Sequence, residues 1–219
     1  MLDAGNRVRF QKKRGAIMKI PTLQGAREML AWADSCNPGP WAAHSKAVAG
    51  AARKIAQVSG LDGDTAEVLG LLHDLGRYTG PTAMLHIYDG YLHLKKKGYE
   101  DAAQICITHS FPVQKIDYYI GANDCSEAVY AEIREVLDNA VYTDYDRLIQ
   151  LCDSICLPEG VCLLEKRLLD VAMRHGVKDT TVENWRAIYK IWQYFEKKSG
   201  RNLYTLFDDV VENTFGIKM

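Results

Sequence analysis

The feature that most constrains the fold of this chain is the spacing of its apolar residues. From Thr22 onward, apolar side chains recur at positions i, i+3 and i+4 in nearly every long segment. This is the period of an amphipathic α-helix, whereas a half-buried strand alternates with a period of two residues. Alternating strand patterns joined by hairpin turns are absent from the sequence. The pattern therefore predicts an all-α fold.

Short segments rich in glycine, proline and polar residues divide this pattern into separate helices. Residues 37–40 and 60–65 are such breaks, and a helix expected from Ala66 to about Leu75 ends at Gly76. Further breaks are expected at residues 80–81, 98 and 111–112. The second half predicts helices over Ser126–Asn139, Tyr145–Leu157, Val161–His175, Thr181–Lys198 and Leu203–Glu212.

The length and charge of the chain limit the classes of function to consider. The sequence has 219 residues and no internal repeat or low-complexity linker, which favours one domain over residues 18–219 with a C-terminal helical extension. The formal net charge is −1. No long-range field therefore draws the whole molecule to nucleic acid or to an acidic membrane. We expect neither a nucleic-acid polymer nor a membrane as a partner.

The cysteines and the first residues indicate the compartment. Six cysteines are present without a CxxC pair or a secretory signal, so we expect reduced thiols in a cytoplasmic protein. Residues 1–17 are polar and basic. They are readable as a nucleic-acid arm or a targeting peptide, but a disordered tail, or an extension upstream of a start at Met18, is favoured.

Polar side chains that end apolar helical runs are the candidate functional residues. His73 and Asp74 directly follow the apolar residues 68–72, while His109 and Asp153 lie in two other mostly apolar segments. A buried imidazole or carboxylate is costly unless it is paired or bound to a metal. Each alone is more often a satisfied core residue, but four in one helical domain favour a shared metal site, since metals accept both ligand types.

The order of these residues resembles a known family. His44, the pair His73-Asp74 and Asp153 follow the H…HD…D pattern of the HD phosphohydrolase superfamily, and residues 71–77 are similar to its core motif. The similarity covers about residues 40 to 160. The resemblance implies an HD-domain helical bundle and a metal-dependent phosphohydrolase acting on a nucleotide or another small phosphorylated metabolite.

Two more histidines are similar to a narrower branch of this superfamily. His86 and His109 lie between the HD pair and the last aspartate, as in six-ligand dinuclear members such as bacterial HD-type hydrolases of symmetrical dinucleoside polyphosphates. This resemblance implies two divalent or transition metal ions, iron first, with manganese, magnesium, nickel or zinc as alternatives. One ion would be held by His44, His73, Asp74 and Asp153, and the second by His86 and His109, with Asp74 bridging.

The resemblance also implies roles in catalysis. Two cations clamp a phosphate and convert a bridging water to hydroxide near neutral pH. Asp74 would take part in generating that hydroxide. Arg77, three residues later, is a candidate catalytic and substrate-binding residue because its planar fork matches a phosphate. The alternative for Arg77 is an ion pair that closes the end of the helix.

Other charged and aromatic residues are expected to lie outside the site. His93, beside three lysines, is expected on a solvated face, and His175 at the end of a helix. The aromatic residues near Trp185 are expected to pack a C-terminal helix and not to stack on a base. Dinucleoside hydrolases carry an arginine shortly after the last aspartate, where this chain has Glu159, and that departure weakens the assignment of this substrate.

Two alternatives to the hydrolase remain. Mixed-valent di-iron oxygenases resemble the same six-ligand pattern, and a non-catalytic regulatory module could retain the fold. Consumption of oxygen would distinguish an oxygenase. We also expect the segment from Tyr78 to Asp89 to be a candidate cover of the site. A homodimer is compatible with apolar residues on the last helices, although no heptad pattern specifies it.

Overall fold

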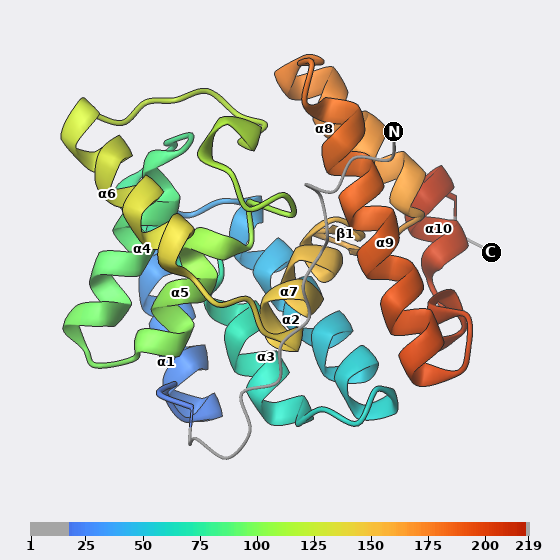
Figure 1. Cartoon of the computed structure of the whole chain (residues 1–219). Coiled ribbons are helices and arrows are strands. Elements are labelled where there is room, and N and C mark those ends of the chain that lie inside the picture. The colour runs from blue at the N-terminus through green and yellow to red at the C-terminus, as the bar shows by residue number, and fades with distance from the viewer. Residues whose placement is uncertain (1–17, 218–219) are drawn as a thin grey trace.

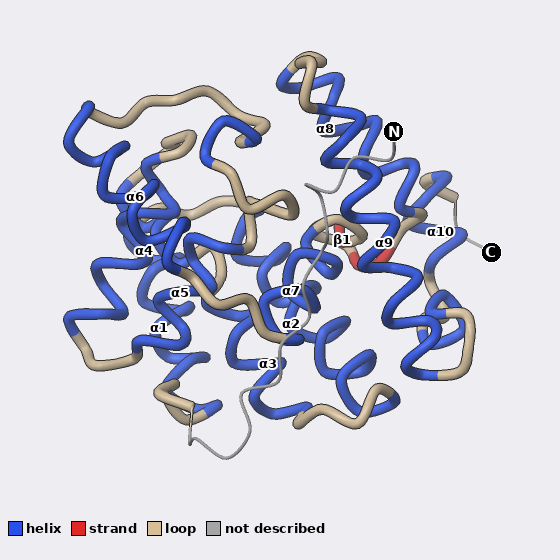
Figure 2. Tube along the Cα trace, viewed as in Figure 1, coloured by secondary structure: helices blue, strands red, loops and turns tan. Residues whose placement is uncertain are grey.

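The structure is a computed structural model that describes residues 18–217. Helices dominate the described residues (Figure 2), so the all-α prediction is confirmed. The prediction of a disordered tail concerns residues 1–17, which lie outside the described residues. No helix in the described part of the chain is long and apolar enough to cross a bilayer. The six cysteines are free thiols, and most of them are buried.

The elements follow one another along the chain as a series of short and medium helices. The α-helices are α1 Leu23–Cys36, α2 Pro40–Val58, α3 Gly63–Leu72, α4 Leu85–Lys96, α5 Glu100–Thr108, α6 Glu127–Asn139, α7 Asp144–Asp153, α8 Leu164–His175, α9 Thr181–Ser199 and α10 Val210–Phe215. The 3₁₀ helices are η1 Leu75–Thr79, η2 Ile116–Tyr118 and η3 Leu203–Leu206, and the strands are β1 Cys156–Leu157 and β2 Gly160–Val161.

The starts of the helices next to the core are fixed by capping side chains. The Asp62 carboxylate accepts the backbone N–H of Thr65 at 2.7 Å and caps α3. At α7, Thr143 and Asp146 form a capping box, in which each side chain accepts the other residue's backbone N–H. Such caps satisfy N–H groups that have no partner inside the helix. They therefore fix where α3 and α7 begin, and so which residues end them.

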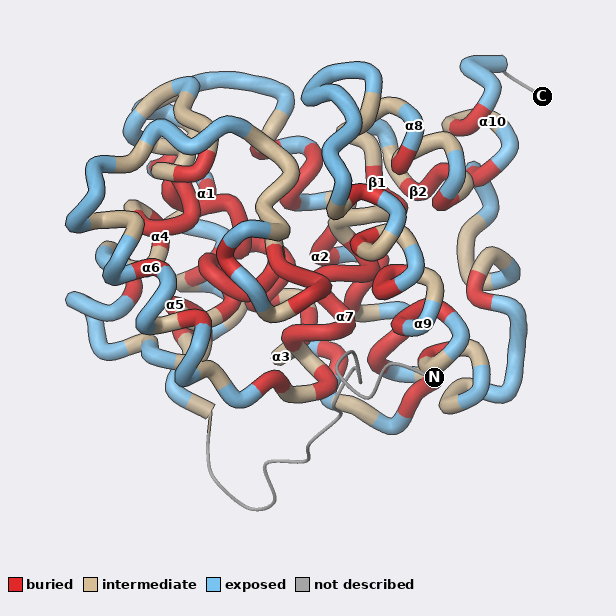
Figure 3. Tube along the Cα trace, turned by 45° about the horizontal axis from the view of Figure 1, so that its top comes forward, coloured by how far each residue is buried: buried red, intermediate tan, exposed pale blue. Residues whose placement is uncertain are grey.

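Helices α2, α3 and α7 form the centre of the molecule. Figure 1 shows α1, α4, α5 and α6 on one side of this centre and α8, α9 and α10 on the other. Buried residues concentrate on the central helices (Figure 3). A second, smaller cluster of buried apolar residues joins α4, α5 and α6. The ends of the central helices therefore lie between two flanking layers.

Two glycines allow the close approach of elements around the HD pair. A Cβ at Gly70 of α3 would lie 2.5 Å from the Cα of Ala49 in α2. A Cβ at Gly76 of η1 would lie 1.9 Å from the backbone oxygen of His86 in α4. Only glycine fits at such distances from backbone atoms. These contacts place His44, the HD pair and His86 on elements that touch.

The expected absence of hairpins was wrong. The segment predicted as a helix to Leu157 ends at Asp153, and Cys156 and Leu157 then pair with Val161 and Gly160 in a small antiparallel hairpin. Pro158 lacks the N–H that a continuing helix needs, and Gly160 has a φ of +147° that favours glycine. Strands of two residues are too short to show alternation in the sequence.

Three more predicted helices have different bounds. The helix expected over Val161–His175 begins only at Leu164, as α8, because Val161 belongs to the hairpin. The helix expected from Ala66 to about Leu75 runs over α3, starts earlier and ends at Leu72, after which the chain tightens into η1. The helix expected over Leu203–Glu212 is divided into η3 and α10. Phe207 between them is extended, with φ −131° and ψ 127°, and packs against the core. Burial of this ring has overridden the local helical pattern.

Candidate metal centre

The six side chains predicted as ligands converge from five helical segments and the turn between two of them. His44 lies in α2, His73 at the end of α3, His86 in α4 and His109 at the end of α5. Asp74 begins η1 and Asp153 is the last residue of α7. All are buried except Asp153, which is partly exposed. Helix ends therefore deliver polar groups into the centre of an apolar core.

Asp74 lies in the middle of the cluster. Its Oδ1 is 3.1 Å from Nε2 of His86 and 3.6 Å from Nε2 of His109. Its Oδ2 is 3.9 Å from Nε2 of His73 and accepts the Nε–H of Arg77 at 2.6 Å. The two carboxylate oxygens thus face different histidines.

Asp153 holds the opposite side of the cluster. Its Oδ1 accepts a hydrogen bond from Nε2 of His44 at 2.9 Å and lies 4.0 Å from Nε2 of His73. The donor atoms of His44, His73 and Asp153 lie within 4.8 Å of one another, as do those of His73, Asp74 and His109. Each set is compact enough for a single cation, and His73 belongs to both.

Three of the histidines are oriented by the ring nitrogen that points away from the cluster. Nδ1 of His73 donates to the Gly70 oxygen at 2.8 Å, Nδ1 of His109 donates to the Ile105 oxygen at 3.1 Å, and His86 likewise donates to Ala83. A carbonyl can only accept, so the proton lies on Nδ1 and the neutral ring turns its Nε2 lone pair inward. This second interaction is typical of metal-ligating histidines.

The protonation states at neutral pH also suit metal ligation. Burial lowers the pKa of His73, and burial together with the charge of His73 lowers the pKa of His109 to about 3. Burial alone would raise the pKa of Asp74, but the surrounding groups, Arg77 foremost and then His73 and His86, together outweigh burial and hold this pKa well below its usual range. Metals bind neutral imidazole and ionised carboxylate. These residues present both forms.

Buried polar atoms without partners test whether a metal fits. Nε2 of His73 and Oδ1 of Asp74 are both fully buried and form no hydrogen bond within the described part of the chain. Nε2 of His109 lies 3.0 Å from the hydroxyl of Ser110, which can donate to it. Buried lone pairs without a donor are costly, and a cation would satisfy all of them. The donor set of imidazole nitrogen and carboxylate oxygen suits a transition metal.

A cavity of about 750 Å³ opens above these ligands. Five of the six line it, the exception being His73. Arg77 lines it as well, with its side chain 31% exposed and one terminal nitrogen 3.5 Å from Nε2 of His86. The ion pair weighed for Arg77 is therefore present, and the same side chain also faces the cavity. Thr82 and Ala83, from the segment considered as a cover, also line it.

Several cavity residues were not found from the sequence. Arg167 and Arg174 of α8, Trp185 of α9, and Tyr119 after η2 line the cavity, and His175, which was expected outside the site, also reaches it. Trp185 is therefore not only a packing residue. Glu159 does not line the cavity and is exposed. None of these positions carries a sequence signal, because α8 and α9 reach the ligands only through the tertiary fold.

Comparison with models of protein families shows which family the chain belongs to. The family described as the HD domain matches residues 41–156, which is more than half of the chain and includes all six ligands. Searches of curated proteins and of solved structures returned no match. The protein therefore belongs to the HD-domain family, a class defined by a helical fold with a central cluster of histidines and aspartates.

Proposed function

We propose that this protein is a metal-dependent phosphohydrolase that acts on a nucleotide or another small phosphorylated metabolite. The observation that carries the proposal is the pair of buried, unpartnered ligand atoms of His73 and Asp74, because Asp74 lines a cavity that also has an arginine in its wall. The HD-domain family supports the same class of reaction. A cation-binding floor beneath a cationic wall suits a phosphate ester or anhydride.

The geometry supports two metal ions. His44, His73, Asp74 and Asp153 would hold one, and His86 and His109 the other, with Asp74 between them. In support, Oδ1 of Asp74 faces His86 and His109 while Oδ2 faces His73. Iron is our first candidate, because three or more imidazoles with carboxylates favour a transition metal over magnesium.

The chain's own residues would bind and orient the phosphoryl group. When bound, the metal ions would supply Lewis acidity and acidify a water near neutral pH. Asp74 holds the Nε–H of Arg77, which fixes the guanidinium in the cavity wall. The remaining N–H groups of Arg77 can donate to phosphoryl oxygens and balance negative charge. Trp41 and Trp185 provide apolar surface for the organic part of the substrate.

Elemental analysis of the purified protein tests the metal centre. We expect about two transition metals per chain, about one in His86→Ala, and none in Asp74→Ala. His93→Ala is the matched control, because His93 lies on the same helix seven residues away and stacks on Trp32 outside the cavity. One metal unaffected by His86→Ala would reduce the centre to a single site. No metal under any loading condition would remove the hydrolase proposal and favour a regulatory binding module.

A screen for phosphate release tests the reaction itself. Nucleoside mono-, di- and triphosphates, symmetrical dinucleoside polyphosphates and sugar phosphates would be assayed with the metal-loaded protein, with oxygen consumption recorded in parallel. We expect phosphate release without oxygen consumption, abolished in Asp74→Ala and retained in His93→Ala. Oxygen uptake that depends on Asp74 would instead assign the di-iron oxygenase alternative.

A further inference from the structure

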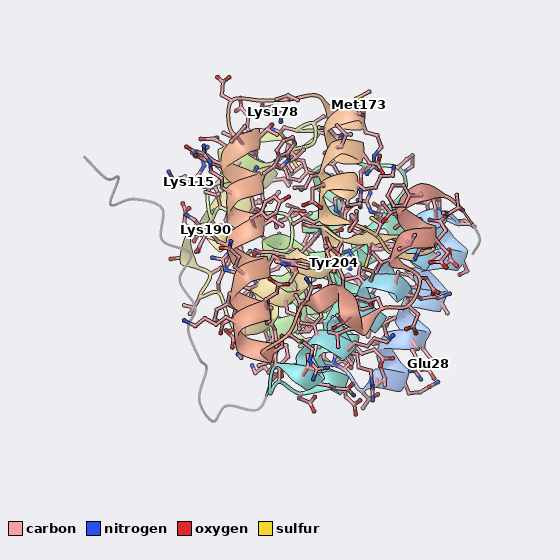
Figure 4. All side chains as sticks on the ribbon, turned by 90° about the vertical axis from the view of Figure 1, so that its right-hand side faces the viewer. Glu28, Lys115, Met173, Lys178, Lys190 and Tyr204 are labelled. Atoms are coloured by element: carbon pink, nitrogen blue, oxygen red, sulfur yellow. The ribbon has the colours of Figure 1, made fainter. Side chains whose placement is uncertain are left out.

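Two arginines of α8 face the same cavity as the metal ligands. Arg167 and Arg174 both line it, opposite the floor that the ligands form. They are separated by seven residues, which is close to two turns of an α-helix, so they lie on one face about 10 Å apart along the axis. Figure 4 shows this side of the molecule, with Met173 near the outer end of α8 and Lys178 at the same end of the helix pair.

Backbone carbonyls hold both arginines in place and leave their terminal nitrogens available. Nε of Arg167 donates to the Cys156 oxygen at 2.9 Å, in the hairpin that follows Asp153. Nε of Arg174 donates to the Asp170 oxygen at 3.3 Å. Among residues 18–217, neither guanidinium forms an ion pair with a carboxylate. Each is thus anchored at one edge and can present its fork to a ligand.

The carboxylates nearby do not neutralise this row of charges. Asp170 lines the cavity, but both of its oxygens accept hydrogen bonds from Lys166 at 2.7 Å. Glu159, the acidic residue after the last aspartate, is exposed and does not line the cavity. Arg77 adds a third guanidinium beside the ligands. Arg77 is paired with Asp74, so among the described residues the unpaired guanidiniums of the cavity wall are those of Arg167 and Arg174 on α8.

The arginines are also close enough to influence one another. Burial and then the charge of Arg167 lower the pKa of Arg174, with Arg77 acting in the same direction. Asp170 and Asp153 act in the opposite direction, but burial and the neighbouring arginines outweigh them. Like charges held close together destabilise one another, and an anion placed between them lowers that cost. A single phosphoryl group at the metal centre cannot also reach the end of α8, since the two arginines alone span about 10 Å.

We propose that Arg167 and Arg174 form a binding subsite for a second phosphoryl group, so that the substrate carries two or more phosphoryl groups and not one. The proposal rests on the proposed function, because it places the first phosphoryl group at the metal centre. Arg167 and Arg77 bind next to that group, and Arg174 binds the most distant one. This subsite takes the place of the arginine that the chain lacks directly after Asp153.

Calorimetric titration with tripolyphosphate and with orthophosphate tests the subsite, using the protein as purified with its metal. We expect tripolyphosphate to bind more tightly. Arg174→Gln should weaken tripolyphosphate binding about tenfold, the loss of one charge-assisted contact, and leave orthophosphate binding unchanged. Arg186→Gln is the matched control: it makes the same change of charge on the neighbouring α9, at an exposed position outside the cavity.

A second pair of variants distinguishes loss of binding from loss of folding. Arg167→Gln also removes the bond to Cys156, whereas Arg167→Lys keeps the charge and should retain more of the tripolyphosphate affinity. Equal effects of Arg174→Gln and Arg186→Gln, or no preference for tripolyphosphate, would overturn the subsite. Phosphate release assayed in parallel distinguishes failure of the subsite from failure of the hydrolase proposal. If the protein hydrolyses a substrate and Arg174→Gln has no effect, only the subsite is contradicted. If binding depends on the arginines but no substrate is hydrolysed, only the hydrolase proposal is contradicted.

Discussion

At the scale of single residues, the metal centre depends on which nitrogen of each histidine is protonated. The backbone oxygens of Gly70, Ala83 and Ile105 fix the proton of three rings on Nδ1. Each of these oxygens lies three or four residues before its histidine in the chain. A histidine near a helix end can therefore find its orienting acceptor locally, without a side chain from elsewhere in the fold to hold the ring. Only the convergence of the three Nε2 atoms requires tertiary structure.

A variant of Arg77 distinguishes an effect on substrate binding from an effect on metal binding. Arg77→Lys keeps a positive charge but loses the Nε–H bond to Asp74 and the planar fork. We expect kcat/KM for the substrate found in the screen to fall by about 10- to 100-fold, with metal content unchanged. Steady-state kinetics and elemental analysis of the same sample measure both. Unchanged kinetics would assign Arg77 to the ion pair with Asp74 alone.

Glu67 gives a pH dependence that is independent of the metal centre. Its carboxylate pairs with Arg27 at 2.6 Å and with Arg53 at 2.5 Å. Burial raises the pKa of Glu67, but the hydrogen bonds from the two arginines outweigh it and leave this pKa below its usual value. A depressed carboxyl pKa stabilises the fold above the unfolded pKa, and this contribution is lost as the pH falls through the folded pKa.

The corresponding variant is Glu67→Gln. Near neutral pH we expect it to lower the free energy of unfolding by about 1 kcal/mol, a small value because both arginines are more than a third exposed. The difference from the unaltered protein should shrink as the pH falls from the ordinary range of a carboxyl group through the lowered pKa of folded Glu67, since below that pKa Glu67 is protonated in both states. Thermal unfolding followed by circular dichroism over this pH range measures it. A pH-independent difference would contradict the assignment.

At the scale of elements, close contacts of η1 with α4 set the position of His86 relative to Asp74. A Cβ at Gly76 would meet the His86 oxygen and, at 2.4 Å, the backbone nitrogen of Gly90. Both are backbone atoms, so the elements themselves would have to separate. We expect Gly76→Ala to lower the free energy of unfolding by about 3 kcal/mol or more.

The same substitution also tests the site, because separation of η1 from α4 moves His86 from Asp74. We expect the Gly76→Ala protein that does fold to bind less metal by elemental analysis. Gly50→Ala in α2 is the control: no atom lies within 4 Å of a Cβ built there, and helix propensity should stabilise the protein by about 0.5–1 kcal/mol. Equal stability of the two variants would contradict the close contact.

At the scale of the whole molecule, hydrogen bonds join the C-terminal helices to residues 118–121, which belong to the layer on the other side of the cavity. Nδ2 of the buried Asn184 in α9 donates to the Tyr118 oxygen at 2.7 Å, and Lys178 donates to the oxygens of Tyr119 and Gly121 at 3.0 and 2.9 Å. Figure 1 shows α9 and the α5–α6 connection approaching from opposite sides. These bonds fix how far α8 lies from the metal ligands, and so the shape of the site.

Metal binding should stabilise the entire fold, because the ligands come from elements spread along the chain from α2 to α7. A ligand that binds only the folded state stabilises it by about 2.7 kcal/mol at 100 times its dissociation constant. We expect a strong chelator to lower the Tm by several degrees and added metal to restore it. Differential scanning fluorimetry measures this, and Asp74→Ala should show no response to either treatment. A Tm insensitive to the chelator in the unaltered protein would contradict a bound metal.

The sequence predicted most helices and a set of candidate ligands that the fold brings together, but not the surroundings of the site. Apolar periodicity is local, so α6 and α9 were placed to within a residue or two of their bounds. The hairpin at Cys156 and the break at Phe207 were missed because long-range packing decides them. His175 was expected outside the site and lines the cavity, since its position depends on where the tertiary fold places the end of α8.

What the sequence determined by itself was the fold class and the identity of the chemically active groups, because both follow from patterns within short segments and from an ordered motif. Tertiary structure alone decided which groups share a cavity. Arg167 and Arg174 are ordinary surface-type residues in the sequence, and they face the candidate metal ligands only because the tertiary fold brings α8 to the wall of the same cavity. The sequence of a helix shows which of its sides is apolar, but which element packs against that side depends on the packing of the whole chain.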